Sequence, residues 1–223
     1  RRTEVWDQEA QDFSIEELTP HADAVLTLSD RNYVKRLPIE AYRLQRRGGK
    51  GVRGQSTREG DGLRDHLVTD NHDTLLFFTN MGRVYRRKGY ELPTDTSRTS
   101  RGTPLVQYLQ TRSEESVSTI LAVSSLEEDA DLFFATRIGE IKRMALSALA
   151  NIRVSGLNAI DLEPGDELVT VRIGSESDDV VMVSGNGMSI RFPAAQVRRS
   201  SRAAGGVRGM RLRDSDEMVA MDV

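Results

Sequence analysis

Apolar residues along this chain come in short runs, and the runs recur in a fixed order. Four times a strand-like run leads through a tight turn into a second strand, at residues 25–36, 75–86, 132–143 and 180–191. Runs of β-branched and aromatic residues bounded by turn residues are typical of β-hairpins. Each turn ends on a residue that tolerates positive φ, and these anchor residues are Asn32, Gly82, Gly139 and Gly187.

The hairpins form a long-period repeat, because the anchors are 50, 57 and 48 residues apart. A glycine-containing stretch, an acidic turn and a further apolar strand follow each hairpin. Several strands per unit at this period predict an all-β, propeller-like fold with about four blades of roughly 50 residues. We place the blades at approximately 13–70, 71–128, 129–177 and 178–223, within a domain spanning 13–223. Residues 1–12 show no periodicity and predict a linker or arm, and 13–15 resemble an additional strand.

Composition limits the classes of protein. Hydrophobic residues make up 38% and charged residues 29%, which suits thin stacked sheets with much surface. The chain has no cysteine, which excludes disulfides and thiolate metal sites and fits a reducing compartment. No apolar run approaches the ~20 residues that span a bilayer, so we expect no membrane partner.

Charge alternates in sign along the repeat, although the formal net charge is only −3. Residues 31–53 hold eight cations and one acid, and residues 191–213 hold seven cations and no acid. Residues 161–179, in contrast, hold seven acids and one cation. If similar segments stack side by side, the basic ones form a belt suited to a polyanion. The alternative is a surface whose charges only keep the protein soluble.

One heptad, Gln45–Gly51, concentrates three cations and three glycines without an acid or an apolar residue. Glycines let the backbone approach closely, while Arg and Lys meet phosphate oxygens. A phosphate-binding loop of the nucleotide-hydrolase type is excluded, because Ser or Thr must follow the lysine and Gly51 follows Lys50. A second signal is an arginine four residues after each anchor, which suggests a row of guanidinium groups on equivalent surfaces. These arginines are Arg36, Arg86, Arg143 and Arg191.

The sequence contains little that points to a catalytic or metal-binding site. The three histidines lack metal-ligand spacing. Each tyrosine lies in or beside a strand pattern without a partnering constellation of basic and acidic groups, so packing is the better interpretation of all five. We therefore predict no catalytic residue and no metal site in this segment.

The heptad resembles the glycine-rich signature of the C-terminal domain of the bacterial DNA gyrase A subunit, which is part of a type IIA topoisomerase. Phe77-Phe78-Thr79, Gly82–Tyr85 and Ala204–Met210 resemble later blades of that family. The resemblance implies a β-pinwheel whose basic perimeter wraps double-stranded DNA with a positive crossover, as required for ATP-dependent negative supercoiling. It also implies an upstream cleavage domain, two protein partners (a second gyrase A subunit, the gyrase B subunit) and a cytoplasmic, nucleoid-associated location. ATP and Mg would be bound by other parts of that enzyme, so no cofactor is expected here.

The predicted DNA-contacting residues combine the heptad with cations of the hairpins. They are Gln45, Arg46, Arg47, Gly48, Gly49, Lys50, Gly51, Lys35, Arg36, Arg86, Arg87, Lys142, Arg143 and Arg191. The family's disc usually has six blades, whereas four units are counted here. One alternative is the equivalent domain of topoisomerase IV, in which the heptad is degraded. A more remote one is a propeller that recognises proteins.

Overall fold

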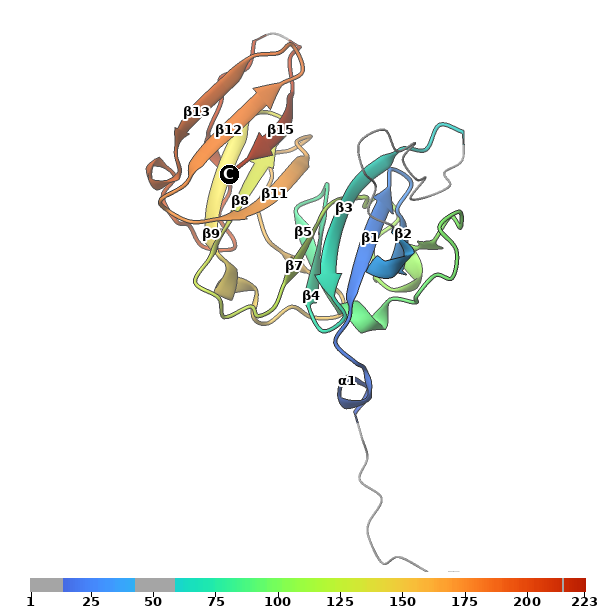
Figure 1. Cartoon of the computed structure of the whole chain (residues 1–223). Helices are drawn as coiled ribbons and strands as arrows, with labels where there is room; N and C mark the ends of the chain where they lie inside the picture. Colours follow the sequence, from blue (N-terminus) through green and yellow to red (C-terminus); the bar gives the residue numbers. More distant parts are fainter. Residues whose placement is uncertain (1–13, 43–58, 214) are drawn as a thin grey trace, which may run out of the picture.

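The chain folds into four small antiparallel sheets that follow one another around an axis (Figure 1). The structure is a computed structural model and describes residues 14–42, 59–213 and 215–223. Within these residues nearly all regular structure is β, so the predicted all-β pinwheel of about four blades is confirmed.

The first two sheets contain four strands each. Blade 1 has the order β3-β1-β2-β6, with bounds Leu63–Asp70, Asp23–Ser29, Tyr33–Pro38 and Thr103–Pro104. Blade 2 has the order β10-β5-β4-β7, with bounds Leu157–Asn158, Arg83–Lys88, Thr74–Thr79 and Val117–Val123. In both, the two hairpin strands are central, because they carry the apolar runs.

The third sheet repeats this plan, and the fourth has three strands among the described residues. Blade 3 has the order β11-β8-β9-β14, with bounds Leu168–Gly174, Asp131–Thr136, Glu140–Ala145 and Val207–Arg208. Blade 4 has the order β13-β12-β15, with bounds Ser189–Pro193, Asp179–Ser184 and Met218–Asp222. Short 3-10 helices follow the hairpins at Ile39–Ala41, Gly89–Glu91, Leu146–Leu149 and Ala194–Gln196, and another lies at Leu105–Gln107.

Neighbouring blades exchange a strand. The short strands β6, β10 and β14 each come from the repeat that follows the sheet they complete. The opposite edge strands, β3, β7, β11 and β15, contact one another in succession around the axis. The exchanged strands therefore form the outer edges of blades 1 to 3. We call the stretches that carry them, residues 92–116, 150–167 and 197–217, the crossing segments.

The predicted turn geometry is confirmed at all four anchors. Asn32, Gly82, Gly139 and Gly187 have φ of 59°, 72°, 86° and 82°. This region disfavours residues with a Cβ atom, and Asn is among the few that tolerate it. The hairpin register thus depends on residues that local sequence alone identifies.

The hydrophobic core lies between blades. One buried cluster joins Phe78 and Leu76 of blade 2 to Phe134 and Leu132 of blade 3. The rings of Phe78 and Phe134 meet edge to face with centroids 5.6 Å apart. Two further clusters join blades 1 and 2 and blades 3 and 4 in the same way. Each sheet is thin, so it buries its apolar side chains against the next repeat.

One local prediction is wrong. The stretch near Ser14 forms the short helix α1 (Ile15–Leu18) and not an additional strand. Ser14 and Glu17 form a reciprocal capping box, in which each side chain accepts a hydrogen bond from the other's backbone N–H. Residues 1–12, predicted as a linker or arm, lie outside the described residues. The part that is described contains no helix with the length and hydropathy of a membrane span.

Candidate nucleic-acid interface

The heptad lies outside the described residues. Gln45, Arg46, Arg47, Gly48, Gly49, Lys50 and Gly51 all fall within residues 43–58. Their predicted role remains a prediction. By the repeat, this stretch corresponds to the crossing segments of the later blades.

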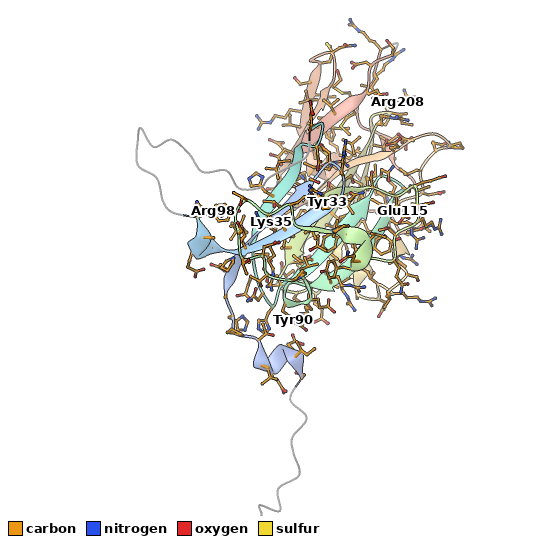
Figure 2. All side chains as sticks on the ribbon, turned by 90° about the vertical axis from the view of Figure 1, so that its right-hand side faces the viewer. Tyr33, Lys35, Tyr90, Arg98, Glu115 and Arg208 are labelled. Carbon is orange, nitrogen blue, oxygen red and sulfur yellow. The ribbon has the colours of Figure 1, made fainter. Side chains whose placement is uncertain are left out.

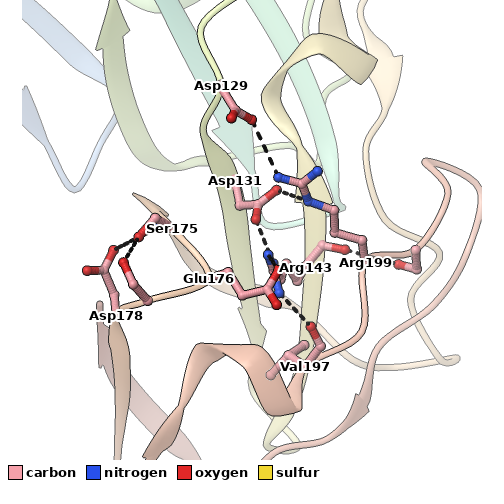
Figure 3. Close-up of polar contacts among 10 residues, drawn as sticks. Asp129, Asp131, Arg143, Ser175, Glu176, Asp178, Val197 and Arg199 are labelled. Carbon is pink, nitrogen blue, oxygen red and sulfur yellow. Dashed lines mark hydrogen bonds and ion pairs between the residues drawn. The ribbon is translucent and has the colours of Figure 1, made fainter.

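The arginine at the fixed offset is buried in blade 3. The side chain of Arg143 is only 3% exposed, and its Nε lies 2.6 Å from Asp131 Oδ2 (Figure 3). Its Nη2 lies 2.8 Å from Glu176 Oε2. Asp131 also accepts a hydrogen bond, at 2.7 Å, from Nε of Arg199, which belongs to the next crossing segment. A buried carboxylate thus joins two arginines from successive repeats.

The equivalent arginines of blades 1 and 2 also contact the next repeat. Arg36 is buried and donates to Thr94 Oγ1 at 2.6 Å, and it also donates to the Asn71 side chain. Arg86 is exposed and donates to the carbonyl of Ala150 at 3.4 Å. The prediction that this position forms a row of exposed guanidinium groups is therefore wrong for Arg36 and Arg143. Their position serves contacts between blades.

Lys35 and Lys142 stand three residues after their anchors and are buried as well. Lys142 Nζ donates to the carbonyls of Ala159, Arg202 and Ala204, each at 2.8 Å. Lys35 Nζ donates to the carbonyls of Ser100, at 3.2 Å, and Arg98, which is beside it in Figure 2. These ammonium groups bind backbone of the crossing segments and are not available to phosphate in this structure.

Tyr85 occupies the same position in blade 2 and shows a second correction. Its hydroxyl donates to Glu115 Oε2 at 2.5 Å, and Arg83 Nε lies 3.2 Å from Glu115 Oε1. Tyr85 therefore has both a basic and an acidic partner, which the sequence did not predict. The predicted packing role still holds, because Tyr85 is only 1% exposed. Burial, strengthened by the bond to Glu115, raises the pKa of the Tyr85 hydroxyl.

The remaining predicted cations reach the surface. Arg191 is exposed, and its Nε donates to Asp179 at 3.0 Å. Arg87 is half-buried and donates to the carbonyl of Tyr108 at 2.8 Å. Together with Arg86, these are the predicted hairpin cations that the structure leaves accessible.

A larger set of cations lies on the crossing segments, and none of them is among the predicted DNA-contacting residues, although residues 191–213 were predicted to be part of a basic belt. Exposed arginines of these segments are Arg98, Arg101, Arg112, Arg153, Arg198, Arg199, Arg202, Arg208, Arg211 and Arg213. They flank the exchanged outer strands and therefore lie toward the rim of the sheets. A usable signal existed, since these segments occupy the same place in the repeat as the heptad.

The sequence pattern of one family, described as "DNA gyrase C-terminal domain, beta-propeller", matches the chain four times, at residues 23–69, 73–124, 130–175 and 178–223. The chain belongs to this family. Each match contains one hairpin and its third strand. The family's repeat is thus the repeat that the anchors revealed.

Curated relatives agree with this assignment. The chain is 41% identical over 223 residues to the DNA gyrase A subunit of Dehalogenimonas lykanthroporepellens and covers 27% of that protein. It is 44% identical over 224 aligned residues to the DNA gyrase A subunit of Staphylococcus aureus and covers 25% of it. Both matches include 100% of this chain. The chain therefore spans about a quarter of the length of these relatives.

Solved structures show the same architecture. A DNA gyrase A C-terminal domain superposes with a TM-score of 0.73 at 27% identity, covering 89% of this chain and 64% of that one. The C-terminal domain of a DNA topoisomerase IV superposes with a TM-score of 0.73 at 25% identity, covering 91% and 61%. The fold is thus shared by both kinds of topoisomerase.

Lys142 makes the stability of this gyrase-family domain sensitive to alkaline pH. Burial lowers its pKa from the ordinary 10.5 to about 8, with Arg202 adding to the shift and Asp161 opposing it. The unfolded chain keeps this proton up to about pH 10.5, so between pH 8 and 10.5 unfolding takes up a proton. Between pH 8 and 10.5, the free energy of unfolding of the unmodified domain should therefore rise by about 3 kcal/mol relative to that of the Lys142→Met variant. Urea titrations of both proteins across this range measure the difference, and a constant difference would contradict the prediction.

Proposed function

We propose that this domain binds duplex DNA without sequence specificity along its outer rim and wraps it. It would act as the C-terminal domain of the A subunit in a DNA gyrase that also contains a second copy of that polypeptide together with the B subunit. ATP-dependent negative supercoiling and cleavage chemistry would belong to the whole enzyme, and the compartment would be the cytoplasm. Membership of the gyrase family and the names of the relatives support this proposal.

The observation that carries it is the set of exposed arginines on successive crossing segments. Arginines at the outer edge of sheets arranged around an axis give a curved series of phosphate contacts. Such contacts position DNA but read no sequence. Smoothly bending 20–30 bp costs on the order of 1–6 kcal/mol, so many distributed contacts are needed to offset it.

Salt dependence tests the proposal. About six phosphate contacts should lower the affinity for a 40-bp duplex on the order of a thousandfold between 50 and 200 mM salt. Affinity that stays constant over this range would exclude a basic rim. Fluorescence anisotropy with a labelled duplex measures it.

Substitution tests the location of the rim. Replacing Arg198, Arg208 and Arg211 together by alanine should reduce the slope of log affinity against log salt by about 3. The control is the triple alanine variant of Arg64, Arg137 and Arg172, which changes the charge equally but removes arginines paired with Asp30, Glu167 and Asp222. An equal loss in both variants would show that only net charge matters.

The heptad is tested separately. Replacing Arg46, Arg47 and Lys50 by alanine should weaken DNA wrapping, read as linking-number change after ligation of a circle, more than it weakens binding. Topoisomerase IV is the second candidate, because its C-terminal domain superposes equally well. If the domain belongs to a topoisomerase IV, the unmodified domain should cause little linking-number change in the same assay.

A further inference from the structure

An acidic groove lies between blades 2 and 3, and Arg202 borders it, because its Nη1 donates at 3.3 Å to the carbonyl of Asn158, which lines the groove. The groove has a volume of about 550 Å³ and is bounded by the turn of the blade 2 hairpin and by the crossing segment of repeat 3. Four exposed acids line it, namely Glu114, Asp161, Glu163 and Glu167. Arg137 compensates part of this charge, since its Nη1 lies 3.6 Å from Glu167 Oε1.

A buried carboxylate in the groove has unused acceptor capacity. Asp166 lines the groove and is only 8% exposed. Its Oδ1 accepts the backbone N–H groups of Ile138, at 3.1 Å, and Glu167, at 2.8 Å. Its Oδ2 is buried and accepts no hydrogen bond from the described residues. An unpaired buried carboxylate oxygen is costly, which favours a site that is completed by a cationic donor.

The negative potential extends behind the groove. Glu140 lies at the start of β9, and its pKa is raised by burial first and then by the charges of Asp166 and Glu163. The charges of Asp166 and Glu163 therefore reach Glu140.

The groove also has apolar walls. Met81, on the turn of the blade 2 hairpin, is 42% exposed, and the half-buried Leu162 of the crossing segment also lines the groove, above the buried Ile160 of the core. Apolar surface beside acids suits a side chain with a long aliphatic stem and a cationic end, or a cation next to an apolar residue.

The fold does not dictate this charge. The equivalent groove between blades 1 and 2 is lined by Arg31 and Arg112 as well as Glu115. Two grooves at the same place in the repeat thus carry different charges, although the backbone plan is the same. The exposed acids of the groove between blades 2 and 3 repel a phosphate backbone, so this groove is not expected to hold DNA itself.

We propose that the groove between blades 2 and 3 docks a protein segment in which arginine or lysine stands next to an apolar residue. Charge complementarity with the four exposed acids, the unused Asp166 oxygen and the Met81 wall together define this occupant. A divalent cation fits less well, because no three carboxylates or histidines of the described residues gather at metal-binding distance. The inference goes beyond the proposed DNA function and does not depend on it.

The test uses the whole 223-residue chain and two fluorescein-labelled probes, a peptide of four Lys-Leu-Arg repeats and one of four Lys-Ser-Arg repeats. Anisotropy at 150 mM salt should show the leucine peptide binding about tenfold more tightly than the serine peptide, because only leucine contacts the apolar wall. Equal affinity for both peptides, or no measurable binding of either, would overturn the proposal.

Variants locate the site. The pair Glu114→Gln with Glu163→Gln removes two acids whose side chains hold no hydrogen bond or ion pair among the described residues, and it should weaken the leucine peptide about tenfold. Met81→Ser should weaken it about fivefold. The control pair Glu59→Gln with Glu127→Gln alters two exposed acids outside the groove and should change affinity less than about twofold. If both pairs weaken peptide binding equally, the peptide is attracted only by the net charge of the domain, and the proposal is overturned.

DNA binding separates this result from the proposed function. The pair Glu114→Gln with Glu163→Gln should leave the salt slope for duplex DNA unchanged, because the slope counts the cations that contact phosphate and these two side chains are acids. A changed slope would contradict the separation of the two surfaces. If the unmodified chain does not bind DNA, the proposed function is refuted, but the peptide result still stands.

Discussion

Replacing Asp131 by alanine is expected to lower the free energy of unfolding by about 3–5 kcal/mol, because it leaves the buried Arg143 without its main partner. Asp131 is 1% exposed and accepts from both Arg143 and Arg199. The remaining acidic partner, Glu176, is 69% exposed and is screened by water. Urea denaturation followed by circular dichroism measures the effect.

The repeat supplies a matched control. Asp179 stands at the corresponding start of β12 and pairs with Arg191, but the side chains are 38% and 72% exposed. Asp179→Ala should therefore cost less than about 1 kcal/mol. Similar losses at both positions would show that burial between repeats adds nothing to the Asp131 pair.

The double variant Asp131→Leu with Arg143→Met separates charge from packing. It removes both buried charges and should recover much of the loss, since apolar residues of similar volume often replace a buried ion pair at little cost. A double variant as unstable as Asp131→Ala would indicate that Arg199 depends on Asp131 for its own position.

Replacing Gly102 by alanine is expected to destabilise the domain by about 3 kcal/mol or more, through left-handed backbone strain and a direct clash. Gly102 has φ of +85°, and an added Cβ would lie 2.3 Å from the carbonyl oxygen of Val34. That oxygen belongs to the strand β2, to which the exchanged strand β6 pairs. The variant should therefore separate repeat 2 from blade 1, which hydrogen exchange of the Val34 and Thr103 amides reports.

A substitution at Gly165 distinguishes backbone strain from the steric clash. The φ of Gly165 is also +85°, but no atom lies within 4 Å of an added Cβ. Gly165→Ala should therefore cost only the backbone strain, about 1–2 kcal/mol. If both variants lose the same stability, the close approach of β6 to β2 is not important.

Local chemistry explains why much of the fold could be predicted from the sequence. A hairpin depends on alternation over a few residues and on one residue that accepts positive φ, as at Asn32 and Gly139. The capping box of Ser14 and Glu17 is equally local, yet the apolar residues at 13–15 led to the prediction of a strand there. Short apolar runs do not distinguish a strand from the first turn of a helix.

The candidate site was predicted less well, because exposure is not a local property. Lys35 and Arg36 are adjacent cations on a strand, and in an isolated hairpin both would reach solvent. Each instead contacts the following repeat, at Arg98 and Thr94, 63 and 58 residues away. The sequence identifies residues 191–213 as basic, but it does not show which arginines of the crossing segments are exposed, because these segments lack strand periodicity.

The sequence by itself determined the repeat, the hairpins with their turns, and the resemblance of the heptad Gln45–Gly51 to one family. Each follows from residues close together in the chain, where backbone preference and side-chain alternation act directly. Only the tertiary structure decided which cations are buried between blades and which face solvent. A charge remains buried where the next repeat supplies backbone carbonyls to receive it, as Ala204 does for Lys142 and Val197 for Arg143, and these partners are 62 and 54 residues away in sequence.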